Sequence, residues 1–536
     1  MPALSIVGVL VGTVFFAISL SPSLLPRPFV VQGVLSGASF AVGYGLGVAG
    51  LALWRFLNLP VAGPQPRRAL TIIGGALCAL VAIAFLWQAS TWQNSIRAAM
   101  GMEEDWGLRP AVIGPVAILV FAVLLTLARL FRRLFRLLSR RLGAYVPPRV
   151  SHVVSIVVSV AVFWSLIDGM LVSSLLRFAD NSFQQLDALI EDDLPRPSRP
   201  EQTGSAESLV AWSGLGRQGR RFVSGGPDAA TLSGFFDTDL AAPIRVYVGL
   251  NSADSPEERA RLALEELIRA GGFERSVLLL ATPTGTGWVD PAGQDPLEYL
   301  FRGDIATVAV QYSYLNSPLA LLTQAAYGAE TARAVFLEIY GYWRGLPADA
   351  RPRLYLSGLS LGSLNSDLSF DLFDIIDDPF EGVLWVGPPF RNESWRRMVR
   401  DRDPGSPAWL PRFRDGAVVR FMNQGGEREG GYAPWGDFRI VVLQYPSDPI
   451  TFFEPSSAWR APAWMKEPRG PDVTPDLRWF PIVTMLQLAA DMVVGTAPRG
   501  FGHEYSPRDY ISAWLALTAP TGWTTGEIDR LEKLFE

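Results

Sequence analysis

The chain has 536 residues, which is enough for two or more domains. Its mean hydropathy of +0.20 and its charged fraction of 18% are unusual for a wholly soluble protein. The formal net charge of -5 argues against a nucleic-acid partner, and the single cysteine, Cys78, excludes an internal disulfide and a cysteine-rich zinc site.

The first third of the chain contains five apolar runs, each near the length of about 20 residues that an α-helix needs to cross a bilayer. They lie at residues 4–20, 29–53, 69–88, 111–128 and 150–176. We therefore predict an all-α transmembrane helical domain over residues 1–178. The first run lacks a basic start and is followed by further runs, so it is interpreted as a retained helix and not as a cleaved signal peptide.

One motif inside this part resembles a cofactor site. Residues Gly45–Gly50 match the pattern G-x-G-x-x-G, but they lie in an apolar run with no preceding strand. Close packing of helices through small residues explains the glycines better than a dinucleotide site does. No cofactor and no metal are expected.

The placement of arginines predicts the orientation in the membrane. The loops after the second and fourth runs are rich in arginine, at residues 55, 67 and 68 and across residues 129–149, whereas the other two loops are poor. The positive-inside rule then makes these rich loops and the N-terminus cytoplasmic. Five spans place everything after Leu176 outside a plasma membrane, and a sixth span would reverse that result.

Residues 179–235 are predicted to be a linker, because much of this range is rich in Pro, Ser, Gly and Arg and has little periodicity. Residues 236–536 alternate apolar runs of strand length with helical patterns. Strands are expected at 244–250, 276–281, 305–312, 354–356, 382–386, 418–422 and 440–445, and helices at 256–270, 319–343 and 361–372. This alternation predicts an α/β domain with a mostly parallel sheet covered on both faces.

A candidate nucleophile lies between one of these strands and the helix that follows it. Residues Gly358–Gly362 match G-x-S-x-G with Ser360 at the centre. In a nucleophile elbow the serine occupies a strained turn from strand to helix, and the small residues two positions away let the backbone fold tightly. The pattern alone is weak, but the strand before it and the helix after it favour an elbow over a structural serine.

A catalytic serine needs a base and an acid that orients the base. His503 is the single histidine of the predicted α/β domain, so it is the candidate base unless a lysine, Lys466 or Lys533, takes that role. Asp448 is the candidate acid because it follows the strand at 440–445, and functional groups gather at the carboxyl ends of parallel strands. Weaker candidates are Asp437, Asp472, Asp476 and Asp491. The order Ser360, Asp448, His503 is that of α/β-hydrolases.

Stabilisation of an oxyanion requires two donors. The first candidate is the backbone N–H of Leu361, the residue after Ser360. The second is the N–H of Thr284 or Gly285, in a glycine-rich loop after the strand at 276–281, although an ordinary glycine turn explains this loop equally well. An aromatic insert between Asp448 and His503 could form a lid or an acyl-binding wall, or could simply pack in the core.

The chain resembles a bacterial, mostly actinobacterial, family of membrane-anchored α/β-hydrolases. That family has a multi-span N-terminal domain followed by a hydrolase domain. The matching stretches are Ser19–Arg27, Leu215–Arg220, Thr284–Trp288, Gly358–Gly362, Asp448-Pro449 and His503. The resemblance implies a Ser-Asp-His hydrolase domain and brings no substrate with it.

These observations predict a membrane-anchored serine hydrolase, similar to esterases and lipases, that cleaves an acyl ester through a covalent acyl-enzyme. An acyltransferase on envelope lipids and a non-catalytic envelope protein that keeps the hydrolase fold are the alternatives. The expected partners are a lipid or acyl-ester substrate and the lipids of the membrane, and the sequence indicates no oligomeric state.

Overall fold

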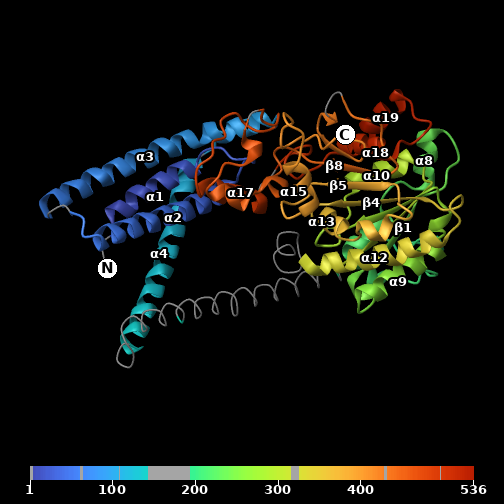
Figure 1. Ribbon diagram of the computed structural model, residues 1–536, viewed down its shortest axis with the longest axis horizontal. Coiled ribbons are helices and arrows are strands. Elements are labelled where there is room, and N and C mark those ends of the chain that lie inside the picture. The colour runs from blue at the N-terminus through green and yellow to red at the C-terminus, as the bar shows by residue number, and fades with distance from the viewer. Residues whose placement is uncertain are drawn as a thin grey trace. The chain divides into compact units, whose positions relative to one another are not determined.

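The computed structural model describes residues 4–60, 64–107, 109–142, 158, 187, 194–314, 325–427, 431–466, 468–494 and 497–536. The chain forms two compact units (Figure 1). The helical unit consists of Met1–Phe178, Phe453–Lys466 and Pro471–Pro498. The sheet unit consists of Ala179–Phe452, Glu467–Gly470 and Arg499–Glu536.

Among the described residues of the helical unit, four helices come from the N-terminal part of the chain. They are α1 (Ile6–Ser19), α2 (Phe29–Phe56), α3 (Pro64–Ala99) and α4 (Arg109–Leu142). The last three are long and apolar enough to cross a membrane, whereas α1 has 14 residues and is shorter than the usual span. The predicted span at 150–176 lies outside the described residues.

Small residues let α1 and α2 pack closely. A Cβ atom on Gly47 of α2 would lie 2.8 Å from the carbonyl oxygen of Val7, and a Cβ atom on Gly12 of α1 would lie 3.0 Å from that of Phe40. Gly47 is the middle glycine of the G-x-G-x-x-G match. Gly47 of the motif therefore allows close contact between α1 and α2, as the apolar context of the motif predicts.

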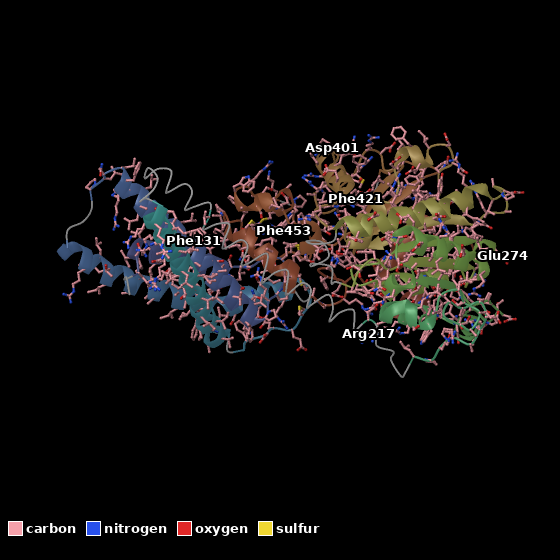
Figure 2. The ribbon with its side chains drawn as sticks, turned by 90° about the horizontal axis from the view of Figure 1, so that it is seen from below. Phe131, Arg217, Glu274, Asp401, Phe421 and Phe453 are labelled. Carbon is pink, nitrogen blue, oxygen red and sulfur yellow. The ribbon has the colours of Figure 1, made fainter. Side chains whose placement is uncertain are left out.

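The helical unit also contains a late part of the chain, here called the insert: Phe453–Lys466 and Pro471–Pro498. Figure 2 labels its first residue, Phe453. The insert carries two 3-10 turns, η5 (Pro455–Ala458) and η6 (Ala463–Met465), and the apolar helix α17 (Val483–Val494). Since α17 contacts both α1 and α2, the aromatic segment between Asp448 and His503 packs with the N-terminal helices.

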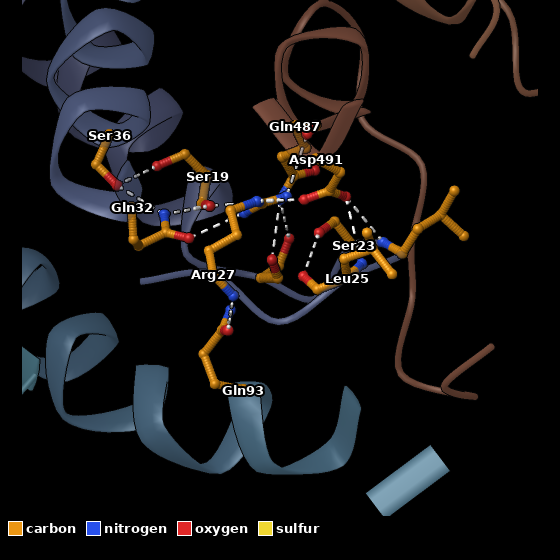
Figure 3. Close-up of polar contacts among 11 residues, drawn as sticks. Ser19, Ser23, Leu25, Arg27, Gln32, Ser36, Gln93, Gln487 and Asp491 are labelled. Atoms are coloured by element: carbon orange, nitrogen blue, oxygen red, sulfur yellow. Dashed lines mark hydrogen bonds and ion pairs between the residues drawn. The ribbon is translucent and has the colours of Figure 1, made fainter. Parts of the chain in front are cut away.

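A buried ion pair joins the insert to the N-terminal helices. Arg27 Nε lies 2.5 Å from Asp491 Oδ1, and neither side chain is exposed (Figure 3). Asp491 Oδ2 also accepts hydrogen bonds from the N–H groups of Leu24 and Leu25, at 3.1 and 3.4 Å. Each charge thus keeps polar partners, which is the condition under which a buried pair is tolerated.

Amide side chains complete this network. Gln487 Nε2 donates to Ser21 O at 2.9 Å, Arg27 Nη1 donates to Gln32 Oε1 at 2.9 Å, and the Arg27 N–H donates to Gln93 Oε1 at 2.9 Å (Figure 3). The contacts come from α2, α3, α17 and the loop after α1. The loop between α1 and α2 is therefore held from several sides.

The described residues of the sheet unit form one sheet of eight strands in the order β1-β3-β2-β4-β5-β8-β6-β7. The strands are β1 (Ile244–Val248), β2 (Val277–Thr282), β3 (Ile305–Val310), β4 (Arg353–Leu359), β5 (Gly382–Val386), β6 (Val419–Asn423), β7 (Gly426–Glu427) and β8 (Arg439–Leu443). All pairings are parallel except that of β6 with β7. The carboxyl ends of the parallel strands consequently share one edge of the sheet.

Helices cover both faces of the sheet (Figure 1). On one face lie α9 (Pro256–Arg269), α12 (Ala325–Gly345) and α13 (Leu361–Asp367), and on the other lie α10 (Pro291–Leu300), α18 (Pro507–Thr518) and α19 (Thr525–Phe535). Large apolar side chains such as Phe421 on β6 fill the space between these layers and are fully buried (Figure 2). The predicted α/β class with a mostly parallel sheet is confirmed.

Two elements differ from expectation. The helix expected at 361–372 ends at Asp367, and a separate short helix, α14 (Leu372–Ile375), starts after a cap by Asp371. The Ser369 hydroxyl bonds to Ser366 O at 2.8 Å, and such local bonds compete with the helical ladder. The range expected to be a linker contains α7 (Gly216–Ser224) and α8 (Ala229–Phe236), which belong to the sheet unit.

Replacing one member of the buried ion pair is expected to destabilise the protein strongly. Asp491→Ala leaves the Arg27 charge buried without its counter-ion, which costs roughly 3–5 kcal/mol. The measurement is the melting temperature of the full chain in detergent. The double variant Arg27→Met/Asp491→Leu is the matched control. Its melting temperature should fall less than that of Asp491→Ala, because no unpaired charge remains buried.

An exposed pair provides the second control. Glu393 and Arg396 lie 3.2 Å apart with exposed side chains, so Glu393→Ala should cost no more than about 1 kcal/mol. If Asp491→Ala lowers the melting temperature no more than Glu393→Ala does, the buried pair is not a stabilising contact.

Candidate active site

Ser360 occupies a strained turn between β4 and α13. Its backbone has φ 56° and ψ -121°, a region that non-glycine residues rarely adopt. The Ser360 N–H donates to Val386 O at 2.9 Å, and the Ser363 hydroxyl donates to Ser360 O at 2.6 Å. These bonds hold the turn from both sides and leave the serine side chain at the carboxyl end of a central strand.

The two glycines of the motif are required by close backbone contacts. A Cβ atom on Gly358 would lie 2.2 Å from the carbonyl carbon of Gly362, and a Cβ atom on Gly362 would lie 2.2 Å from Thr282 O. Both distances are far below van der Waals contact with backbone atoms that cannot move aside. The spacing G-x-S-x-G therefore places glycine at the two positions around Ser360 where backbone segments come too close for a side chain.

Asp448 and His503 are brought together by the loops after β8 and before α18. His503 Nδ1 lies 2.7 Å from Asp448 Oδ2, although 55 residues separate them. Asp448 is fully buried, and its Oδ2 also accepts from Tyr505 Oη at 2.8 Å and Thr451 Oγ1 at 3.1 Å. Its Oδ1 accepts from the Ile450 N–H at 2.8 Å. The Asp448 carboxylate thus has several hydrogen-bond partners, and one of them is the His503 imidazole.

The electrostatics around His503 favour a charged imidazole. Burial lowers the pKa of His503, but the adjacent Asp448 carboxylate, with Glu504 and Asp290, raises it, and the net result is a pKa above its ordinary value of 6.5. The Asp448–Nδ1 contact also leaves Nε2 as the ring nitrogen that can exchange a proton. Nε2 is buried and has no hydrogen-bond partner within the described part of the chain.

A cavity of about 540 Å³ opens at this edge of the sheet. Ser360 and His503 both line it, together with Thr284, Trp288, Asp290, Ile450, Arg499, Glu504, Tyr505 and Phe535. Ser360 Oγ and His503 Nε2 are not hydrogen-bonded to each other. The cavity thus combines polar atoms with aromatic and aliphatic surface, as small-molecule sites do.

The expected oxyanion donors have different surroundings. The Leu361 N–H lies in the first turn of α13, where helical N–H groups lack a partner within the helix. The Thr284 N–H donates to Trp288 O at 2.9 Å, so it is already used. Gly285 is buried in the same loop.

None of the alternative residues lines the cavity that contains Ser360. Lys466 and Asp491 belong to the helical unit, and Lys533 is exposed on α19. Among the residues that the structure describes, no group of three or more His, Cys, Asp or Glu is placed to hold a metal ion.

Tyr505 and Asp290 are among the cavity residues that the sequence does not predict. Tyr505 bonds to the buried Asp448, and its position two residues after His503 was the available signal. Asp290 lines the cavity and caps α10, accepting from the Ala292 N–H at 2.9 Å and from Tyr510 Oη at 3.0 Å. An aspartate followed by proline predicts a helix N-cap. Nothing in that pattern indicates that Asp290 also lines a cavity.

Comparison with known families gives two matches. A family model described as "Alpha/beta-hydrolase family" matches residues 244–531, and one described as "Alpha/beta-hydrolase family N-terminus" matches residues 20–227. The first covers more than half of the chain and includes every residue of the cavity except Phe535. No curated protein and no solved structure matches the chain significantly.

Removing the charge of Asp290 is expected to stabilise the protein at neutral and alkaline pH. Burial raises the pKa of Asp290 to about 6, from 3.8. The folded state therefore binds this proton more tightly than the unfolded chain, and stability from the neutral carboxyl is lost as the pH rises from about 4 to about 6. Asp290→Asn should recover at most about 3 kcal/mol.

Unfolding of the wild type and Asp290→Asn at pH 5 and pH 8 measures this effect. The advantage of the variant should be larger at pH 8 than at pH 5. Asp401→Asn, at an exposed aspartate outside the cavity, is the control (Figure 2). An Asp290→Asn advantage that is absent or equal at both pH values contradicts the expected desolvation of this carboxyl.

Proposed function

Because the chain belongs to the alpha/beta-hydrolase family, we propose that it is a membrane-anchored serine hydrolase that cleaves an acyl ester. The observation that carries the proposal is the strained Ser360 turn beside a cavity that also contains His503, whose other ring nitrogen is bound to the buried Asp448. Serine, histidine and aspartate in these relations are the groups of acyl transfer through a covalent enzyme intermediate.

The proposed reaction begins when Ser360 Oγ attacks the ester carbonyl carbon and its proton passes to His503 Nε2. The Leu361 N–H stabilises the oxyanion, and Asp448 stabilises the imidazolium that forms. The C–O bond to the alcohol then breaks, and the leaving oxygen takes the proton from His503. Water repeats these steps on the acyl-enzyme and releases the acid.

The separation of Ser360 Oγ from His503 Nε2 is compatible with this course. Catalytic hydrogen bonds are often long in the absence of substrate and shorten in the Michaelis complex. The aromatic and aliphatic part of the cavity, formed by Trp288, Ile450 and Phe535, suits an acyl group. Together with the apolar helices, this favours lipid or acyl-ester substrates at a membrane.

The orientation in the membrane forms part of the proposal. In the helical unit the insert contacts Arg27, in the loop after α1, and Ser95, near the end of α3, through Asp491 and Thr474. These are the arginine-poor ends of the helices. The insert joins the sheet unit directly at both of its ends, so the positive-inside rule supports a sheet unit outside the plasma membrane and a cytoplasmic N-terminus.

Covalent labelling tests the proposed chemistry. A fluorophosphonate probe should phosphonylate the wild type in detergent or membranes, with loss of fluoride, and should not label Ser360→Ala. His503→Ala should slow labelling by at least about 10³-fold, because the hydroxyl then has no base. Ser276→Ala, at an exposed serine just before β2, is the control and should label as the wild type does.

The pH dependence gives a second measure in the same assay. As the pH falls, His503 gains a proton and labelling should weaken. The midpoint of this loss should lie above pH 6.5, because the pKa of His503 is raised. A correctly folded wild-type protein that resists the probe would support the non-catalytic alternative. Product analysis with and without an acceptor alcohol separates hydrolysis from acyl transfer to that alcohol.

Single cysteines test the orientation. In a Cys78→Ser background, a membrane-impermeant maleimide should label Lys533→Cys, in the sheet unit, on intact cells. Leu59→Cys, in the exposed loop after α2, should react only after permeabilisation. The reverse pattern would place the sheet unit in the cytoplasm.

A further inference from the structure

Three polar atoms beside the cavity have no hydrogen-bond partner in the part of the chain that is described. Two are the hydroxyls of Ser360 and Thr284, which line the cavity, and the third is Nε2 of His503, which is buried. Ser360 is 3% exposed and Thr284 is 8% exposed. Polar atoms that line a cavity without a partner from the chain can bond to a ligand that enters it. Ser360 and His503 have roles in the proposed reaction, whereas the Thr284 hydroxyl has none.

The backbone of Thr284 is already engaged in a turn. Its N–H donates to Trp288 O at 2.9 Å, and its carbonyl oxygen accepts from the Gly287 N–H at 2.9 Å. The hydroxyl is therefore the free donor of this residue. These two bonds also fix the loop after β2, so the hydroxyl is carried on a backbone that is held in place.

The same loop packs directly against the serine turn. Thr282 pairs with Gly358 in the sheet, and a Cβ atom on Gly362 would lie 2.2 Å from Thr282 O and 3.1 Å from Pro283 O. Gly362 follows Leu361, whose N–H lies at the start of α13. Thr284 is thus two residues beyond the point where its loop touches the first turn of that helix.

We propose that the Thr284 hydroxyl donates the second hydrogen bond to the oxyanion, alongside the Leu361 N–H. A hydroxyl rotates about its C–O bond and can turn its proton toward charge as that charge develops. A donor aimed at the oxyanion contributes mainly in the transition state, which distinguishes it from a residue that only binds substrate. This inference rests on the proposed hydrolase function.

Two substitutions isolate the hydroxyl. Thr284→Val keeps the branched shape and removes the donor, whereas Thr284→Ser keeps the donor. With p-nitrophenyl butyrate as the probe ester and the full chain in detergent, Thr284→Val should lower kcat by about 10²–10³-fold and leave KM within about threefold. Thr284→Ser should retain at least about a tenth of the wild-type kcat.

The melting temperature of each variant separates catalysis from folding. If Thr284→Val does not fold, Thr284→Ala takes its place against Thr284→Ser. A folded Thr284→Val with wild-type kcat overturns the inference and leaves a backbone donor such as the Gly285 N–H. Equal losses in folded Thr284→Val and Thr284→Ser overturn it as well, because the hydroxyl is then not the cause.

Failure of the proposed function gives a different result. In that case the wild type neither turns over the ester nor reacts with the fluorophosphonate probe. A wild type that is active and labelled, beside a Thr284→Val variant of unchanged kcat, refutes the role of Thr284 alone.

Discussion

The close approach of three backbone segments around Ser360 is the constraint on which the sheet unit depends. Gly358 and Gly362 bring the end of β4, the start of α13 and the loop after β2 together at distances that no side chain would allow. The parallel register of β2, β4, β5 and β8 places the loops that carry Thr284 and Asp448 at the same edge. The strain at Ser360 is thus supported by the sheet itself, because moving any of these strands would break the turn.

Much of the sheet unit could be predicted from the sequence because its signals are local. Buried parallel strands form continuous apolar runs, and the cap of α9 at Ser255 is visible in its own residues. The turn at Ser360 could be predicted because the G-x-S-x-G spacing reflects close backbone contacts between residues that are near in sequence. The scarcity of histidine in the sequence is enough to indicate His503 as the candidate base.

The remainder depends on contacts between distant residues. The sequence predicts the Thr284 N–H as an oxyanion donor, whereas in the structure this group donates to Trp288 O. A glycine-rich loop does not reveal which groups pair within it. The insert has the composition of a cap or a core helix, but it belongs to the helical unit, where α17 contacts α1 and α2 and Asp491 pairs with Arg27. No periodicity in one sequence specifies such a pair. Its members are identifiable only as a charge within an apolar helix and an arginine in a short loop.

The order of synthesis gives this ion pair a further significance. Arg27 and Asp491 are separated by 464 residues, so at roughly 5–20 residues per second the arginine is made tens of seconds before its counter-ion. During that interval the nascent chain must satisfy a cation beside helices that are already complete. Gln32, on α2, accepts a hydrogen bond from the Arg27 guanidinium, whereas Gln93, on α3, accepts one from the Arg27 backbone N–H. Of these two amides only Gln32 reaches the charged group, so the guanidinium obtains its counter-ion only after Asp491 has been made.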